Sequence, residues 1–194
     1  MSRFLIPSWE EIHESVLRLV NDILVNGYKI DLIVGILRGG YVVARILCDL
    51  LKANDIGVVE VKFYRGVEEK AERPIITQPL TADVRGKNVL IVDDVVDSGR
   101  TLEIVTEQVR LRGAKNVKSA VLYYKPKSII KPDYFVHETV EWVVFPWEWC
   151  EFIREFIARE RIDNYERLLQ RLKELSFPLS DSFLRELIIH VSRT

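Results

Sequence analysis

The chain has 194 residues, 48% of them hydrophobic, which is enough to bury one substantial core, and we expect one domain with an appendage. Its 28 basic and 29 acidic residues give a net charge of −1, so no overall positive field is available to hold a nucleic-acid backbone. The two cysteines and three histidines are too scattered for a disulfide framework or a metal cage, and no apolar run could span a bilayer, so we expect a cytoplasmic protein.

The first predicted element is an amphipathic helix over residues 8–27. Ser8 suits its N-cap, and Glu11 three residues later completes a capping box. Apolar side chains then recur at helical spacing until Gly27, which predicts the end of the helix.

Strand and helix signals alternate through the next part of the chain. The continuous apolar run at 31–37 predicts a buried strand, the turn at 38–40 is Arg-Gly-Gly, and residues 41–53 predict a helix that packs on a sheet. Residues 57–66 alternate like a second strand. The polar, proline-containing segment 67–86 predicts a mobile loop or flap rather than a simple connection.

The pattern continues with a strand at 87–94, a helix at 98–113 and a strand at 114–125. Strands joined by helical crossovers predict an α/β fold, with a central, mostly parallel sheet that helices cover on both faces. Ligands of such sheets bind beyond the carboxyl ends of the strands.

Three carboxylates stand at one predicted strand end, in the stretch DDVVDSGRT at 93–101. Such carboxylates repel one another and lose hydration unless a ligand, cation or hydroxyl group engages them. Asp93 and Asp94 can accept hydrogen bonds from a vicinal diol, and the loop at 98–101 can hold a phosphate at a helix N-terminus. The pattern predicts a site for a phosphorylated ribose. Neither nucleotide-binding glycine motif is present, which disfavours a kinase or a dehydrogenase.

The stretch VLIVDDVVDSGRTL at 89–102 resembles the phosphoribosyl-diphosphate signature of the type I phosphoribosyltransferases. The resemblance runs over residues 1 to about 155 and is greatest to archaeal-type purine enzymes and to hypoxanthine-guanine and xanthine-guanine enzymes. Further matching segments are RGG at 38–40, VKFYRGVEEKAERPIITQP at 61–79, YYKPKSIIKPDYF at 123–135 and EWVVFPWE at 141–148.

The resemblance implies the type I phosphoribosyltransferase fold. Residues 1–150 are expected to form the catalytic domain, including a small hood, and residues 151–194 a helical extension packed on it or on a partner subunit. The helical spacing after residue 151 predicts two or three helices, the last capped by Ser180 or Asp181. Its role, including any regulation by a nucleotide, stays open.

The resemblance also implies how 5-phosphoribosyl 1-diphosphate (PRPP) is bound. Asp93 and Asp94 match the acids that hold the ribose hydroxyls and a metal, and Asp97 matches the carboxylate that manages the N7/N9 proton of the purine. A flap matches residues 64–79, and a non-proline cis peptide is expected at Leu37–Arg38. The remaining contacts to phosphate and diphosphate are expected from Arg38, Gly39, Val95, Val96, Ser98, Gly99, Arg100, Thr101 and Arg154.

Base recognition is expected in the hood. Lys125 matches a lysine that donates to the exocyclic O6 of a 6-oxopurine, while Trp142 and Val143 match the pair that stacks on the ring and offers backbone groups to its edge. Glu148 matches an acid near a second metal, although this acid is commonly aspartate and direct metal contact is open. The KPK stretch at 125–127 is otherwise read as a solvated basic segment.

The activity that the resemblance implies is transfer of the 5-phosphoribosyl group from PRPP to N9 of hypoxanthine, guanine or xanthine, with Mg²⁺, in a homodimer. The alternatives are an adenine phosphoribosyltransferase on the same scaffold and a non-catalytic PRPP-binding regulator. Lys125 favours an oxo group, because an ammonium only donates hydrogen bonds. A regulator that binds nucleic acid would need a basic surface or an added domain, and the sequence has neither. The sequence gives no order of preference among hypoxanthine, guanine and xanthine.

Overall fold

The computed structural model describes residues 4–53, 55–64 and 73–193. They fall into two compact units: unit 1 comprises residues 1–12 and 141–194, and unit 2 comprises residues 13–140. The domain boundary expected at residue 150 lies within unit 1, where Val144 and Trp149 share a hydrophobic core with Phe152 and later residues. The middle of the expected flap, residues 65–72, lies outside the described residues.

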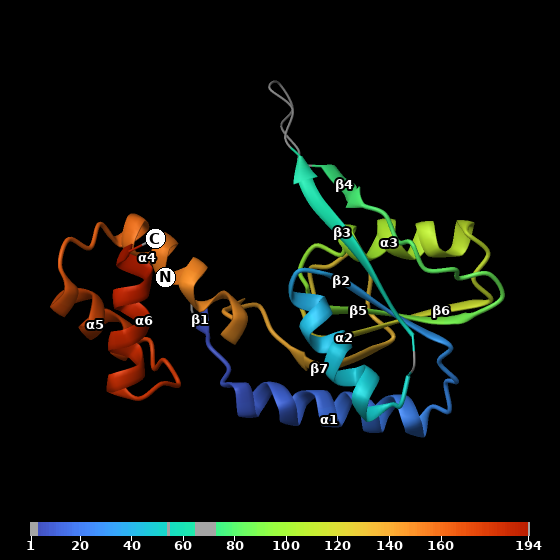
Figure 1. Ribbon diagram of the computed structural model, residues 1–194, viewed down its shortest axis with the longest axis horizontal. Coiled ribbons are helices and arrows are strands. Elements are labelled where there is room, and N and C mark those ends of the chain that lie inside the picture. The colour runs from blue at the N-terminus through green and yellow to red at the C-terminus, as the bar shows by residue number, and fades with distance from the viewer. Residues whose placement is uncertain (1–3, 54, 65–72, 194) are drawn as a thin grey trace. The chain divides into compact units, whose positions relative to one another are not determined.

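Unit 2 contains a six-stranded sheet with strand order β4-β3-β2-β5-β6-β7 (Figure 1). All neighbouring strands are parallel except β3 and β4, so the predicted α/β fold with a mostly parallel sheet is confirmed. The strands are β2 (Leu32–Leu37), β3 (Ile56–Tyr64), β4 (Arg73–Gln78), β5 (Asn88–Val96), β6 (Asn116–Tyr124) and β7 (Tyr134–Glu138). The helices are α1 (Trp9–Val25), whose first residues belong to unit 1, α2 (Gly39–Leu50) and α3 (Arg100–Leu111).

Strand β4 corrects the expectation of a loop over residues 67–86. Its residues pair antiparallel with β3, and Pro74 stands opposite Phe63. A proline lacks a backbone N–H and is tolerated in an edge strand, and β4 lies at the edge of the sheet. The proline and the polar residues of segment 73–78 therefore belong to an exposed edge strand and not to a loop.

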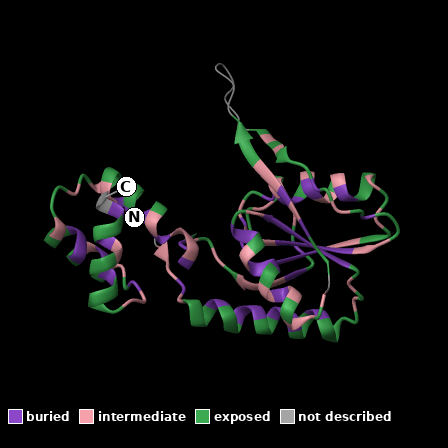
Figure 2. Cartoon of the chain, viewed as in Figure 1, coloured by how far each residue is buried: buried purple, intermediate pink, exposed green. Residues whose placement is uncertain are grey.

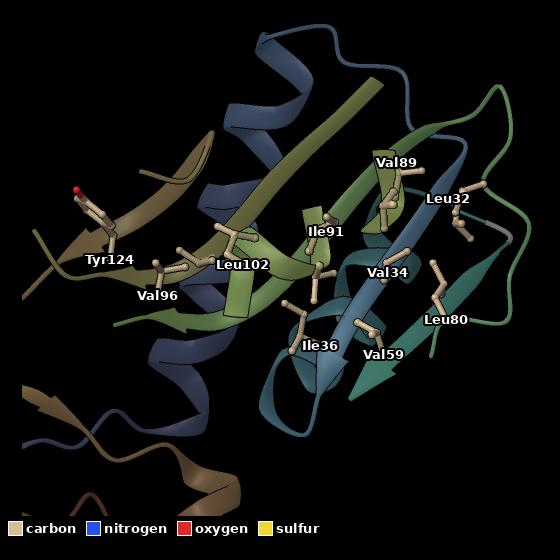
Figure 3. Packing of buried hydrophobic residues seen from close by; sticks show 14 residues of the cluster. Leu32, Val34, Ile36, Val59, Leu80, Val89, Ile91, Val96, Leu102 and Tyr124 are labelled. Carbon is tan, nitrogen blue, oxygen red and sulfur yellow. The ribbon is translucent and has the colours of Figure 1, made fainter. Parts of the chain in front are cut away.

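Helices cover both faces of the sheet. One core combines residues of α3 with alternate residues of the strands, including Leu32, Val34 and Ile36 of β2 (Figure 3). Gly35 of β2 faces the other way, because a Cβ built on it would lie 3.0 Å from the Ala44 Cβ in α2. Residues of both faces are therefore buried along the central strands (Figure 2).

The capping box of the first helix is present as predicted. The Ser8 backbone N–H donates to Glu11 Oε2 at 2.7 Å, and the Glu11 N–H donates to Ser8 Oγ at 3.1 Å. Two backbone donors that helix geometry leaves unpaired are thus satisfied reciprocally. Gly27 follows the helix with a φ of +65°, a conformation that glycine adopts without strain.

Unit 1 is built around a second core, formed mainly by the residues after 140. Strand β1 (Phe4–Leu5) pairs in parallel with β8 (Trp142–Val143), and a 3₁₀ turn, η1 (Pro146–Glu148), leads into α4 (Trp149–Glu160). Helices α5 (Tyr165–Glu174) and α6 (Asp181–Arg193) follow α4, so three helices are described where the sequence predicts two or three. Ser180 Oγ accepts from the Phe183 N–H at 3.3 Å, so Ser180 rather than Asp181 is the cap. In the parts of the chain that are described, no helix combines the length and apolar character needed to cross a membrane.

The Tyr28 hydroxyl links the amino ends of strands β5 and β6, and its ionisation at high pH is expected to lower the stability of the fold. Its hydroxyl donates to the backbone oxygens of Val89 and Asn116, at 3.0 and 3.2 Å. Burial, followed by the charge of Asp133, raises the pKa of Tyr28 from about 10 to about 12. Between these values the unfolded chain loses the phenolic proton and the folded chain keeps it, so this contribution to stability is present below pH 10 and is lost as the pH rises.

The free energy of unfolding is therefore expected to fall more steeply between pH 10 and 12 in the wild type than in Tyr28→Phe. Phenylalanine keeps the ring but has no proton to lose. Urea unfolding followed by tryptophan fluorescence, at intervals from pH 9 to 12, measures both slopes. Parallel curves would contradict the assigned role of the Tyr28 hydroxyl.

Candidate active site

The predicted site residues of unit 2 gather at one edge of the sheet. Strands β2, β5 and β6 are parallel neighbours, so their carboxyl ends lie together. Arg38 follows β2, Asp97 follows β5 and Lys125 follows β6. The sheet thus brings together three segments that are far apart in the sequence, at the edge where ligands of parallel sheets bind.

The acidic pair lies in the second half of strand β5, and Val95 and Val96 end the strand after it. Asp93 Oδ1 accepts from the Asp94 N–H at 3.0 Å, and Asp94 Oδ1 accepts from the Val95 N–H at 2.7 Å. Asp94 is buried, with 8% of its surface exposed. Val96 is also buried, and its carbonyl accepts from the Lys125 N–H at 2.9 Å. The backbone bonds fix the directions of the two carboxylates at the strand end.

The predicted phosphate loop turns directly into helix α3. Gly99 is the N-cap and has a φ of +84°, which side chains rarely allow. Ser98 Oγ accepts from the Arg100 N–H at 3.4 Å, and the Gly99 carbonyl accepts from the Glu103 N–H at 2.9 Å. The loop therefore lies at the positive end of the α3 dipole, together with Thr101 in the first turn, as a phosphate site requires.

The Arg-Gly-Gly turn lies against the acidic strand end. The peptide bond Leu37–Arg38 is cis, as the resemblance implied, and α2 begins at Gly39. A Cβ built on Gly40 would lie 2.6 Å from the Val92 carbonyl oxygen and 2.7 Å from the Asp93 Cα. Glycine is therefore required at 40, because the first turn of α2 touches β5 where the carboxylates begin.

Asp97 stands between two ammonium groups. Lys125 Nζ is 3.4 Å and Lys127 Nζ is 2.7 Å from Asp97 Oδ1. The Lys125 side chain is buried, whereas that of Lys127 is 67% exposed. Burial of Asp97 opposes its ionisation, but the close contact with Lys127 and the charges of both lysines outweigh burial and hold its pKa below the usual range. Asp97 is thus a carboxylate at neutral pH.

The remaining predicted site residues belong to unit 1. Trp142 and Val143 form β8, Glu148 ends the 3₁₀ turn and Arg154 lies in α4. The Trp142 side chain is exposed, while Val143 is buried and pairs with Leu5. Their proposed contacts with base, metal and pyrophosphate stay predictions.

Lys127 joins the candidate site, although the sequence predicts only a solvated basic segment at 125–127. Its ammonium is the nearer of the two cations at Asp97. Residues 125–128 form a turn, closed by the Ser128 N–H, which donates to the Lys125 carbonyl at 2.9 Å. This turn brings the ammonium groups of Lys125 and Lys127 to the same carboxylate oxygen.

The carboxylates of the site suit a hard cation that binds together with the substrate. Asp93 and Asp94 supply carboxylate oxygens, the ligand type that Mg²⁺ prefers. Within the described ranges, no group of three or more His, Cys, Asp or Glu side chains is placed to hold a metal ion. A metal held by this acidic pair would therefore need further oxygen ligands from the substrate or from water.

Comparisons with known proteins agree with this geometry. Residues 8–151 match the family model described as phosphoribosyl transferase domain. A xanthine-guanine phosphoribosyltransferase of Gluconobacter oxydans (strain 621H) is 34% identical over 143 residues, which cover 73% of this chain and 82% of the relative. Another, from Idiomarina loihiensis (strain ATCC BAA-735 / DSM 15497 / L2-TR), is 33% identical over 150 residues, covering 76% of this chain and 88% of that relative.

Solved structures show the same likeness. A purine phosphoribosyltransferase from Pyrococcus horikoshii Ot3 is 40% identical with a TM-score of 0.68, and the match covers 74% of this chain and 93% of that one. A hypothetical protein from Neisseria gonorrhoeae with bound ppGpp is 28% identical with a TM-score of 0.68, covering 76% of this chain and 90% of the other. The family match ends at residue 151, so most of α4 and all of α5 and α6 lie beyond it.

Proposed function

The chain belongs to the phosphoribosyl transferase domain family, and we propose that it is a pentosyltransferase that transfers the 5-phosphoribosyl group of PRPP to N9 of a 6-oxopurine. The products are a purine nucleoside monophosphate and pyrophosphate, as expected of a purine salvage enzyme. One observation supports this function best: Asp97 and the buried Lys125 form an ion pair beside the loop that is suited to the 5-phosphate. We further propose that the enzyme is a cytoplasmic homodimer.

The phosphate loop and the acidic pair hold the sugar. The N–H groups at the start of α3, with Ser98 and Thr101, bind the 5-phosphate, and Asp93 and Asp94 accept hydrogen bonds from the ribose hydroxyls. Mg²⁺, when bound with the diphosphate, neutralises the charge that develops on the leaving group, and Asp93 and Asp94 would hold it. Fixing the sugar in this way turns the transfer into a reaction between positioned groups.

Asp97 and Lys125 act on the purine. The bond from C1 of the ribose to the pyrophosphate oxygen breaks as the bond from C1 to N9 forms, and the pyrophosphate keeps the electron pair. The displaced ring proton passes from the imidazole part of the purine to the Asp97 carboxylate and later to water. Lys125 donates to O6, which identifies an oxo group because the ammonium has no acceptor for the hydrogens of an amino group.

An assay with separate bases tests the proposed function. The protein is mixed with PRPP, Mg²⁺ and one purine at a time, and nucleotide formation is followed. Product with guanine, hypoxanthine or xanthine is expected. Product with adenine alone would overturn the argument from Lys125 and favour an adenine enzyme, whereas PRPP binding without product from any purine would favour a regulator.

Lys125→Ala is expected to lower kcat/KM for guanine by roughly 10- to 100-fold, because a hydrogen bond from a charged group contributes about 1.5–3 kcal/mol. The KM for PRPP is expected to change much less, since Lys125 faces the base. Steady-state kinetics with each substrate varied in turn measures both effects. Lys131→Ala is the control. Lys131 lies in the same loop as Lys125, but its ammonium lies over the ring of Phe135 in β7. Equal losses for guanine and PRPP would contradict the assignment.

A further inference from the structure

The segment that carries Lys125 and Lys127 is fastened to the phosphate loop. The Lys125 N–H donates to the Val96 carbonyl at 2.9 Å, and the Ile129 N–H donates to the Ser98 carbonyl at 3.0 Å. The turn between them is closed by the Ser128 N–H, which donates to the Lys125 carbonyl at 2.9 Å. These bonds hold both lysines beside Asp97.

Gly99 shows how tightly the two segments fit. A Cβ built on Gly99 would collide with Ser128 Oγ and lie 3.0 Å from the Ile130 backbone nitrogen. Ser128 Oγ in turn donates to the Ile130 carbonyl at 2.7 Å and accepts from its N–H at 3.2 Å. The position of Lys127 relative to Asp97 is therefore set by packed backbone, even though its ammonium is exposed to solvent.

The two lysines cannot have the same role during the reaction. If the buried Lys125 turns its ammonium to the purine O6, its attraction to Asp97 weakens. Lys127 stays at the same carboxylate, and its exposed side chain is not the one directed to the base in the proposed function. Asp97 must remain a carboxylate until it takes the ring proton, so it still needs a cation at that stage.

We propose that Lys127 is a positioning residue, which holds the Asp97 carboxylate aimed and ionised while Lys125 is engaged by the purine. This inference rests on the proposed function. Among the described residues, the charged groups that act on Asp97 are Lys125 and Lys127, and burial of the carboxylate works against both. Without Lys127, the only cation left at Asp97 among the described residues is Lys125, and in the substrate complex the purine draws Lys125 away. The partly buried Asp97 carboxylate then takes up a proton from solvent at a higher pH than in the wild type.

The acid limb of kcat tests the proposal, because kcat against pH reports the groups of the substrate complex. At saturating PRPP and guanine, Lys127→Met is expected to move this limb upward by roughly one pH unit, a value reduced for the exposure of the ammonium. Lys127→Arg is expected to restore the wild-type limb, and Lys131→Met is expected to leave it unchanged. A limb that does not move in Lys127→Met, or that Lys127→Arg does not restore, would overturn the proposal.

A titration without turnover separates this inference from the proposed function. In protein labelled with ¹³C at aspartate carboxyl carbons, with the Asp97 signal assigned from Asp97→Asn, the Asp97 resonance gives its pKa directly. That pKa is expected to rise in Lys127→Met and to return in Lys127→Arg. If the wild type uses no purine, the proposed function fails, yet this titration still decides whether Lys127 holds Asp97 ionised. An unchanged resonance would refute the pairing even in an active enzyme.

Discussion

Asp97→Asn is expected to lower kcat for 6-oxopurines by roughly 10²- to 10⁴-fold, the range that a positioned general base contributes. The amide has nearly the same shape, but it cannot accept the purine ring proton at neutral pH. PRPP binding is expected to persist, because the acidic pair and the phosphate loop do not depend on this side chain. Single-turnover measurements at saturating PRPP distinguish a slower chemical step from weaker binding.

Asp83→Asn is the matched control for that experiment. Asp83 is an exposed aspartate whose Oδ1 accepts from the Arg85 N–H at 3.2 Å and lies 3.8 Å from Arg85 Nε. The same change of acid to amide at this position is expected to leave kcat unaltered. Unchanged turnover in Asp97→Asn would remove Asp97 from its proposed role, whereas equal losses in both variants would point to a general effect on folding.

The clustering of the candidate site residues at one edge of the sheet could be predicted because its signals are local. A buried strand that ends in carboxylates, and a glycine that opens a helix, are both visible in a few consecutive residues around Asp93 and Gly99. The parallel sheet then brings the ends of β2, β5 and β6 to one edge without further information. The capping box at Ser8 and Glu11 was equally readable, because both partners lie within one helical turn.

The parts that could not be predicted depend on contacts between distant residues or on very short elements. Strands β1 and β8 pair over two residues each, Phe4 with Trp142 and Leu5 with Val143, which is too short for any periodicity. The core of unit 1 joins Val144 and Trp149 to Phe152 and later residues, and contacts between residues so far apart leave no local pattern in the sequence. Lys127 reaches Asp97 only because backbone bonds fasten two loops together.

Gly40→Ala is expected to damage the site through backbone packing alone, since it changes no polar group. The added methyl would lie 2.6 Å from the Val92 carbonyl oxygen and 2.8 Å from Asp93 Oδ1, so either α2 or strand β5 must shift. Overpacking of this kind costs about 1–3 kcal/mol, which corresponds to a fall in Tm of roughly 2–12 °C for a chain of this size. Displacement of Asp93 is expected to lower kcat/KM for PRPP by roughly 10²-fold.

Gly86→Ala separates the loss of site geometry from the loss of stability. Gly86 has a φ of +69° and no neighbour within 4 Å of a built Cβ, and it precedes β5 at the opposite end of that strand from Asp93. Alanine there costs about 1–2 kcal/mol of backbone strain without a steric clash. Thermal unfolding and PRPP kinetics of both variants are therefore expected to show comparable falls in Tm, with a loss of kcat/KM only in Gly40→Ala. If Gly40→Ala keeps wild-type kinetics at a temperature where it is folded, the turn after β2 does not position Asp93.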